Sequence, residues 1–313
     1  PIRRYAALLV HRALVDSFGL EQPKPKSRLP ESSGLSETDR ANIAIPSLSD
    51  AVFTLSADGQ EQDAMFLTGR AGARIGYRIS KNLSLLGGLS LAKRANVDEA
   101  FDTGTADVDL GLSYQAGRNT WGVSLMGQRY EVDNDLFRSV KGLNAQWLYT
   151  IDGRNDVSVF GQLADIDYYP EANSVRDTKL RLLGVGWSHA FSGAGSPTMY
   201  LSGYVAREDD RNNLPNLSRD YYGVRVGGGY NISADVQAFA SANVQVSDYG
   251  GTETLFLTSR DDDFVELSAG VNYRPEKGWT ITPQVRYSRN SSNIPVNDYD
   301  RISAWAVVRF DYR

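Results

Sequence analysis

The 313-residue sequence contains no cysteine, only three methionines and only two histidines. The lack of thiols excludes a disulfide scaffold and a thiolate metal site. No stretch approaches the roughly 18 consecutive apolar residues of a membrane-spanning helix, so a helical membrane protein is also excluded. The net charge of −5 lacks the basic excess that phosphate contacts need, and we therefore expect no nucleic-acid partner.

What the chain has instead is alternation of apolar and polar residues with a period of two, which is typical of β-strands with one apolar face. In residues 262–274, one face would carry Val265, Leu267, Ala269, Val271 and Tyr273, and the other Glu266, Ser268, Gly270, Asn272 and Arg274. A strand that hides its apolar side chains in this way can cross a bilayer although the chain is polar on average.

Alternation of this kind predicts thirteen strands from residue 63 onward, each long enough to cross the hydrocarbon layer when tilted. They are 63–79, 82–94, 105–116, 119–131, 138–151, 155–168, 176–191, 197–208, 218–231, 235–248, 262–274, 278–291 and 300–313. Single-chain bacterial barrels have even strand numbers, so we place a fourteenth strand at residues 4–18. The run YAALLVHRAL there also favours a helix, which leaves a linker or plug helix as the alternative.

The connections between these strands alternate in length. Short turns at 80–81, 116–118, 152–155, 192–195, 233–234 and 275–278 alternate with longer polar connections at 95–104, 132–137, 169–175, 209–217, 249–261 and 292–299. Short periplasmic turns and longer extracellular loops are typical of outer-membrane barrels. The sequence thus predicts an all-β protein, a closed antiparallel transmembrane β-barrel of 14 strands in the bacterial outer membrane. A soluble β-sandwich is the alternative, but its strands are usually about five or six residues long.

Two sets of residues follow from this fold. Aromatic residues recur at the short-turn ends and predict a periplasmic girdle at the lipid headgroups: Tyr77, Tyr114, Trp121, Tyr149, Trp187, Tyr230, Tyr273, Trp279 and Tyr312. Charged residues on the polar faces are predicted to line the lumen: Arg70, Arg74, Arg78, Asp107, Asp109, Arg225, Glu266, Arg274, Arg286 and Arg309. These charges would either brace the wall through ion pairs or select what passes, and the sequence favours neither over the other.

Residues 1–20 form the first strand or a linker, and residues 21–62 form a connection far longer than the others, ahead of the remaining barrel at 63–313. Long connections in compact folds are usually functional or disordered, so residues 21–62 are predicted as a lid or constriction, with a mobile loop as the alternative. Acidic clusters mark the expected outer loops at 98–102, 133–135, 208–210, 261–263 and 298–300. Their spacing is not an EF-hand pattern, and we predict solvated loops without a metal.

No enzyme signature emerges. His11 and His189 are the only imidazoles, and His189 would lie at the short-turn end, away from the acidic loops. The glycines at 223 and 227–229 fall within a strand pattern, so they do not form a phosphate-binding loop. We expect neither catalytic residues nor a cofactor.

Several segments resemble the surface lipoprotein assembly modifier family, also called the type XI secretion outer-membrane proteins, whose barrels are often joined to tetratricopeptide repeats. They are GQRYEVDNDLFR (127–138), VGWSHAF (185–191), SRDYYGVRVGGGY (218–230) and TPQVRYSRNSSNIPVNDYDRISAWAVVRFDY (282–312), and the resemblance spans residues 60–313. It implies a fourteen-stranded barrel that helps lipoproteins or haem-related proteins across the outer membrane. Phe310 and Tyr312 also resemble the aromatic terminal signal that the barrel-assembly machinery recognises.

These expectations lead to a translocation pore for a protein or lipoprotein client, without covalent chemistry, in contact with outer-membrane lipid and lipopolysaccharide. Two alternatives stay open. One is a passive or gated porin for small solutes or an exported polysaccharide, and the other is a structural barrel in a larger surface assembly.

Overall fold

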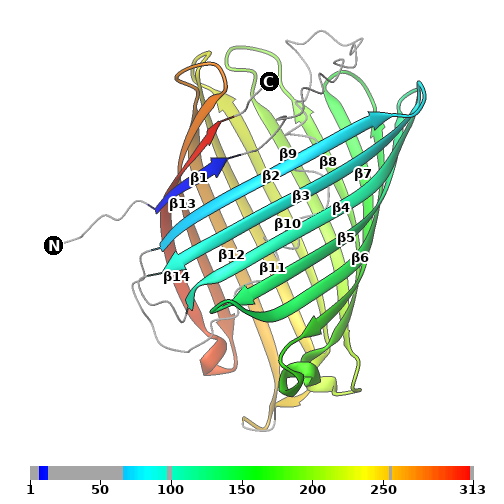
Figure 1. The fold of residues 1–313 in the computed structure, drawn as a ribbon, viewed down its shortest axis with the longest axis vertical. Helices are drawn as coiled ribbons and strands as arrows, with labels where there is room; N and C mark the ends of the chain where they lie inside the picture. Colours follow the sequence, from blue (N-terminus) through cyan, green and yellow to red (C-terminus); the bar gives the residue numbers. More distant parts are fainter. Residues whose placement is uncertain (1–6, 13–65, 97–100, 254–255, 311–313) are drawn as a thin grey trace, which may run out of the picture.

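A computed structural model describes residues 7–12, 66–96, 101–253 and 256–310 of the chain. Within these residues the protein is all-β, and thirteen antiparallel strands form one sheet that curls into a barrel wall (Figure 1). The strands are β2 (Phe66–Arg78), β3 (Leu83–Asn96), β4 (Thr103–Ala116), β5 (Asn119–Val132), β6 (Asp135–Thr150), β7 (Asn155–Tyr168), β8 (Thr178–Ala190), β9 (Thr198–Asp210), β10 (Arg219–Asn231), β11 (Val236–Glu253), β12 (Thr258–Tyr273), β13 (Trp279–Ser292) and β14 (Tyr299–Phe310). The thirteen strands predicted from residue 63 onward are confirmed, with only their ends displaced.

Two of the predicted long connections are wrong. β5 and β6 meet in a tight turn at Asp133 and Asn134, whose φ angles of 52° and 63° match the type I′ hairpin that two-residue loops prefer. The polar run at 249–261 is mostly strand, because β11 continues to Glu253 and β12 begins at Thr258, past a register shift after Asp248. Short 3₁₀ helices occupy three other connections: η2 (Glu171–Arg176), η3 (Pro215–Leu217) and η4 (Pro295–Asn297).

The fourteenth strand also differs from the prediction. β1 (Ala7–Arg12) is six residues long and pairs in parallel with both β14 and β2, whereas an antiparallel strand over residues 4–18 was expected. Thirteen antiparallel strands leave β2 and β14 running the same way, so a strand between them must be parallel to both or antiparallel to both. β1 is parallel to both. The predicted lid at residues 21–62 and the girdle residue Tyr312 lie outside the described residues.

The register of the sheet gives each strand an outer and an inner face. On the outer face, apolar residues stand side by side across strands, as in the row Leu112, Val123 and Ala145. Many of these side chains are exposed, among them Ile75 at 61% and Leu125 at 62%. Apolar patches of this extent on a protein surface mark a binding or membrane-facing surface. Among the described residues, no helix is long and apolar enough to span a membrane.

The inner face packs on one side into an apolar cluster on β6 to β10. Its buried members are Val140, Phe160, Ala164, Ile166, Leu180, Tyr204, Ala206 and Tyr221. The wall accommodates these large rings by placing glycines beside them. An added Cβ at Gly184 would collide with the Phe160 ring, and one at Gly227 would collide with the Tyr200 ring. On β10, Gly223 and Gly227 lie next to the rings of Tyr204 and Tyr200, and all four glycines of this strand are wall positions.

Candidate functional site

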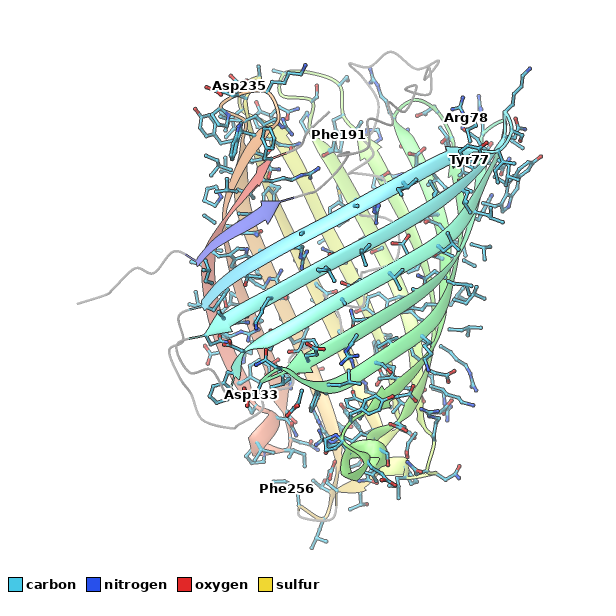
Figure 2. All side chains as sticks on the ribbon, viewed as in Figure 1. Tyr77, Arg78, Asp133, Phe191, Asp235 and Phe256 are labelled. Atoms are coloured by element: carbon cyan, nitrogen blue, oxygen red, sulfur yellow. The ribbon has the colours of Figure 1, made fainter. Side chains whose placement is uncertain are left out.

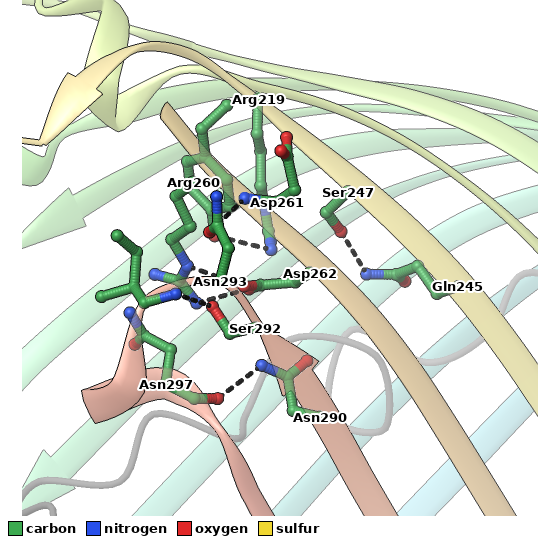
Figure 3. Close-up of polar contacts among 12 residues, drawn as sticks. Arg219, Gln245, Ser247, Arg260, Asp261, Asp262, Asn290, Ser292, Asn293 and Asn297 are labelled. Carbon is green, nitrogen blue, oxygen red and sulfur yellow. Dashed lines mark hydrogen bonds and ion pairs between the residues drawn. The ribbon is translucent and has the colours of Figure 1, made fainter. Parts of the chain in front are cut away.

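A chain of polar contacts crosses the inner face of β9 to β12 at the end of the longer loops, and we call it the loop-end network; Figure 3 shows its members Arg219, Arg260 and Asp262. Its five members are Glu208, Arg219, Tyr249, Arg260 and Asp262. Arg219 donates two hydrogen bonds to the Glu208 carboxylate, at 3.0 and 2.9 Å. Arg260 Nε donates to Asp262 Oδ1 at 3.0 Å. Both guanidinium groups also lie over the ring of Tyr249, at 5.9 and 4.5 Å from its centroid.

This arrangement satisfies buried charge in two ways. Each arginine has a carboxylate for its charge, and two-point Arg–carboxylate contacts are among the stronger hydrogen bonds in proteins. The ring between the arginines attracts both cations, at distances where cation–π contacts are significant. The network therefore fixes four neighbouring strands to one another where the wall meets the longer loops.

A second polar chain crosses β4 to β6 at the same end. Gln128 donates from Nε2 to Asp107 Oδ1 at 2.7 Å and accepts from Arg138 Nη2 at 2.6 Å. Arg138 is fully buried, and its guanidinium lies 5.7 Å from the ring centroid of Tyr130. A buried arginine held by polar groups from adjacent strands is a bracing element, because its removal leaves those groups unsatisfied.

All ten residues predicted to line the lumen lie on β2, β4, β10, β12, β13 and β14 or the turn after them, and the register places those within strands on the inner face. Glu266 and Arg286 come together as an ion pair at 3.6 Å, and Arg286 also lies 5.2 Å from the Trp305 ring centroid. Arg225 lies 5.9 Å from the Tyr200 ring centroid. Arg70, Arg74, Arg78, Arg274 and Arg309 are exposed on this face. Whether these residues line a conducting lumen stays a prediction.

The acidic clusters at 208–210 and 261–263 were assigned to outer loops, but they lie within β9 and β12. Glu208, Asp210 and Asp262 of these clusters face inward and are only 8%, 7% and 6% exposed. The spacing in the sequence could have placed them on the inner face. Glu208, for example, follows Tyr204 and Ala206 at intervals of two and therefore shares their face of the strand. The arginines of the loop-end network and Arg138 were missed because a single charged residue at a strand end has the same local pattern as a loop residue.

Aromatic residues gather on the outer face at the opposite, short-turn end. Figure 2 shows Tyr77 and Phe191 there, with Asp133 and Phe256 at the other end. Tyr114 stacks on Trp121 with ring centroids 5.8 Å apart, and Trp279 lies 4.9 Å from Phe310. Tyr149, Trp187, Tyr230 and Tyr273 also occupy the outer face at this end, so the described members of the predicted girdle form one row. Trp147 and Phe310 belong to the row as well, and sequence reasoning missed them.

His189 lies in this row rather than near any acidic cluster. Its Nδ1 is 2.7 Å from Asn155 Oδ1, and its ring stacks on Trp187 and meets Phe191 edge-on. The side chain of His11 lies outside the description. In the part of the chain that the structure describes, no group of three or more His, Cys, Asp or Glu residues is arranged to hold a metal.

An apolar outer face, a charged inner face, strands of 12 to 18 residues and an aromatic row at one end define an outer-membrane β-barrel. Residues 55–312 match the model of the surface lipoprotein assembly modifier family. The chain belongs to this family, and it is an outer-membrane barrel involved in surface lipoprotein assembly in Gram-negative bacteria.

No curated protein sequence matches the chain. Among solved structures, it is similar to OmpT, an outer membrane protein of Vibrio cholerae, with 13% identity and a TM-score of 0.47 over 76% of this chain and 84% of that one. A FadL homologue of Pseudomonas aeruginosa gives 13% identity and a TM-score of 0.42 over 79% and 75%. A bacterial polysaccharide outer membrane secretin gives 10% and 0.42 over 82% and 94%. Similarities this remote identify no activity for this chain.

Proposed function

We propose that this barrel is a translocation pore that passes a lipoprotein client to the cell surface without covalent chemistry. One observation carries the proposal: outside the apolar cluster of β6 to β10, the inner face carries polar and charged residues from one strand end to the other, as on β2 and β13, while the middle of the outer face is apolar. A hydrophilic path through the membrane would be enclosed by such a wall. Family membership supports a lipoprotein as the client.

The proposal includes a closed wall of fourteen strands in the membrane. Unpaired backbone groups at the edges of β2 and β14 would each cost several kcal/mol in lipid, on the order given for orphaned polar groups. The pairing of β1 with both edges supports closure. Insertion by the barrel-assembly machinery, through the terminal aromatic signal, is part of the same proposal.

The absence of catalysis is also proposed. His189 faces outward between the rings of Trp187 and Phe191 at the short-turn end, and its Nδ1 hydrogen bond goes to the Asn155 amide and not to a nucleophile. A general base must reach the proton that it removes. Passage of the client would then depend only on the charge of the inner face and on the width of the barrel.

Surface exposure of lipoproteins in living cells tests the proposal. Intact cells with and without the chain would be treated with protease, and the released lipoproteins would be quantified against their total amounts. We expect one or a few lipoproteins to lose surface exposure without the chain while their totals persist. Unchanged exposure of every surface lipoprotein would contradict the proposal.

A porin for small solutes is the second candidate, and the exposed arginines of the inner face favour it because they indicate a face open to water. Single-channel conductance of the purified chain separates the two. A steady current would favour the porin, and a current only after deletion of residues 21–62 would favour gated export. The lack of cysteine offers a matched control. A bulky maleimide at Ser90→Cys on the inner face should reduce any current, whereas the same label at Lys81→Cys in a turn should not.

A further inference from the structure

A strip of arginines covers the inner faces of β13, β14, β2 and β3, the four strands on either side of β1. By register, the inner faces of these described strands carry seven arginines and no Asp, Glu or Lys: Arg70, Arg74, Arg78, Arg94, Arg286, Arg301 and Arg309. The nearest acidic residues on the inner face belong to the next strands, Glu266 on β12 and Asp107 and Asp109 on β4. We call these seven residues the arginine strip.

Most of the arginine strip is accessible. Arg70, Arg74, Arg78, Arg301 and Arg309 are exposed, and Arg94 and Arg286 are half-buried against the rings of Phe66 and Trp305. The residues directly opposite the three β2 arginines on β3 are small: Ala92, Gly88 and Ser84. Small cross-strand partners leave room beside these guanidinium groups, and the Asp109 carboxylate of β4 reaches over Gly88 into the space next to Arg74. Arg286 is paired with Glu266 at the edge of the strip, but the five exposed arginines present their charge to the inside of the barrel.

The three arginines of β2 also have a regular spacing. They recur at every fourth residue, which corresponds to about 13 Å between successive side chains on one face of a strand. Arg78 is at the short-turn end of β2, and Arg70 lies toward the end of the longer loops. Positive charge thus extends along the length of the wall rather than being concentrated at one rim.

This distribution favours an anionic chain over a single anion. A distance of about 13 Å exceeds the Debye length of about 8 Å at physiological ionic strength, so each arginine acts on its own neighbourhood. A surface of one sign between low-dielectric walls attracts opposite charge. An extended polypeptide has the same rise per residue as β2, so acidic residues at every fourth position would face successive arginines.

We propose that the arginine strip is a track for acidic, extended polypeptide segments inside the barrel. The proposal deepens the proposed function and rests on it for the identity of the passenger. A polypeptide fits better than a glycan, because its repeat equals that of the β2 arginines.

Binding can be measured without translocation, which separates this proposal from the proposed function. The probe is a fluorescein-labelled peptide with glutamate at every fourth position among glycine, serine and threonine, and its partner has lysine at the same positions. Fluorescence anisotropy with the purified full chain in detergent gives the affinities. We expect the glutamate peptide to bind, the lysine peptide not to bind, and high salt to abolish binding.

Two triple variants with equal loss of charge locate the site. Arg70→Gln with Arg74→Gln and Arg78→Gln should weaken binding about tenfold, which corresponds to about 1.4 kcal/mol. Arg129→Gln with Arg181→Gln and Arg207→Gln removes three arginines from the outer face, where their side chains are 59%, 62% and 58% exposed, and should leave binding unchanged. Lysine at the three β2 positions should retain binding, and a heat-induced shift on gels checks folding of every variant.

Three results would overturn the proposal. The first is equal weakening by the outer triple, which would mean that net charge alone attracts the peptide. The second is equal binding of the glutamate and lysine peptides. The third is binding of heparin, as an anionic glycan probe, by a chain that does not bind the glutamate peptide. Each can occur whether or not lipoprotein exposure in cells depends on the chain.

Discussion

Tyr204 on β9 covers Gly223 on β10 so closely that a Cβ at Gly223 would lie 2.5 Å from the Tyr204 hydroxyl oxygen. The Tyr204 hydroxyl group donates to Gln245 Oε1 on β11 at 2.9 Å, so this side chain reaches across β10 to a third strand. Gln245 in turn donates to Ser247 at 3.2 Å (Figure 3). One glycine therefore sets the position of a ring that ties three strands together.

The first prediction concerns this contact. Gly223→Ala should lower the free energy of unfolding by about 1–3 kcal/mol, because the added methyl group forces the Tyr204 ring away. Gly203→Ala is the matched control on the neighbouring strand, where an added Cβ would meet only the Gly223 carbonyl oxygen at 3.8 Å. It should be neutral or slightly stabilising. Urea unfolding in lipid vesicles measures both, and equal effects would refute the packing argument.

The second prediction concerns membrane depth along β12. Leu267 lies in the middle of the apolar outer face, between the outward Asp263 and the aromatic Tyr273. Leu267→Arg should destabilise the barrel by about 2–4 kcal/mol, the cost of a cation at the bilayer midplane. Val271 shares this outer face but lies next to Tyr273 of the aromatic row, so Val271→Arg should cost about 1 kcal/mol or less.

Asn272→Arg is the control for that experiment, because Asn272 lies on the inner face and donates to Gln237. Its cost should stay well below that of Leu267→Arg in the same unfolding assay. If the inner and outer substitutions cost the same, the assignment of faces is wrong.

The third prediction concerns the loop-end network. Glu208→Ala removes the carboxylate that accepts two hydrogen bonds from Arg219 and should cost about 3 kcal/mol, since it leaves a cation largely buried without its partner. Asp209→Ala changes the adjacent residue, which pairs with Arg181 and Arg207 on the exposed outer face. Exposed pairs contribute about 0–1 kcal/mol. The loop-end network lacks the proposed bracing role if the two variants unfold alike.

The fourth prediction tests the direction of β1. Oxidation should join Leu8→Cys to Ala306→Cys, because these positions are Cα partners in the parallel pairing. A reversed β1 with the same faces would instead bring Leu8→Cys near Val308→Cys, which is also on the outer face. The chain has no other cysteine, so a non-reducing gel identifies the product directly. Cross-linking of the second pair alone would establish an antiparallel β1.

The sequence was sufficient to predict the strands of the barrel wall, because the alternation of apolar and polar residues is a local property. Side chains two apart share a face whatever the neighbouring strand does, so the strands from β2 to β14 and the outward aromatic row could be predicted. The connections between the strands were harder to predict from the sequence. Asp133 and Asn134 form a tight turn through their positive φ angles, and polarity alone cannot distinguish such a turn from a loop.

The direction of β1 and the members of the loop-end network depend on partners far along the chain. β1 pairs with β14, nearly 300 residues away, and no periodicity within residues 4–18 specifies which way it runs. Arg219 and Glu208 are near each other in sequence, but their contact with Arg260 passes through the Tyr249 ring of a third strand. Contacts of this kind follow from the register of the whole sheet.

The tight turn at Asp133 and the long hairpin of β11 and β12 make the rim of the barrel uneven. Figure 2 shows Phe256, in the turn of that hairpin, well past the level of Asp133. In the outer membrane, the longer-loop end faces the cell exterior. An antibody or bacteriophage approaching the cell would meet the β11–β12 projection first. The low side near Asp133 would lie among the sugar chains of neighbouring lipids, which makes the projection the preferred place for an epitope tag.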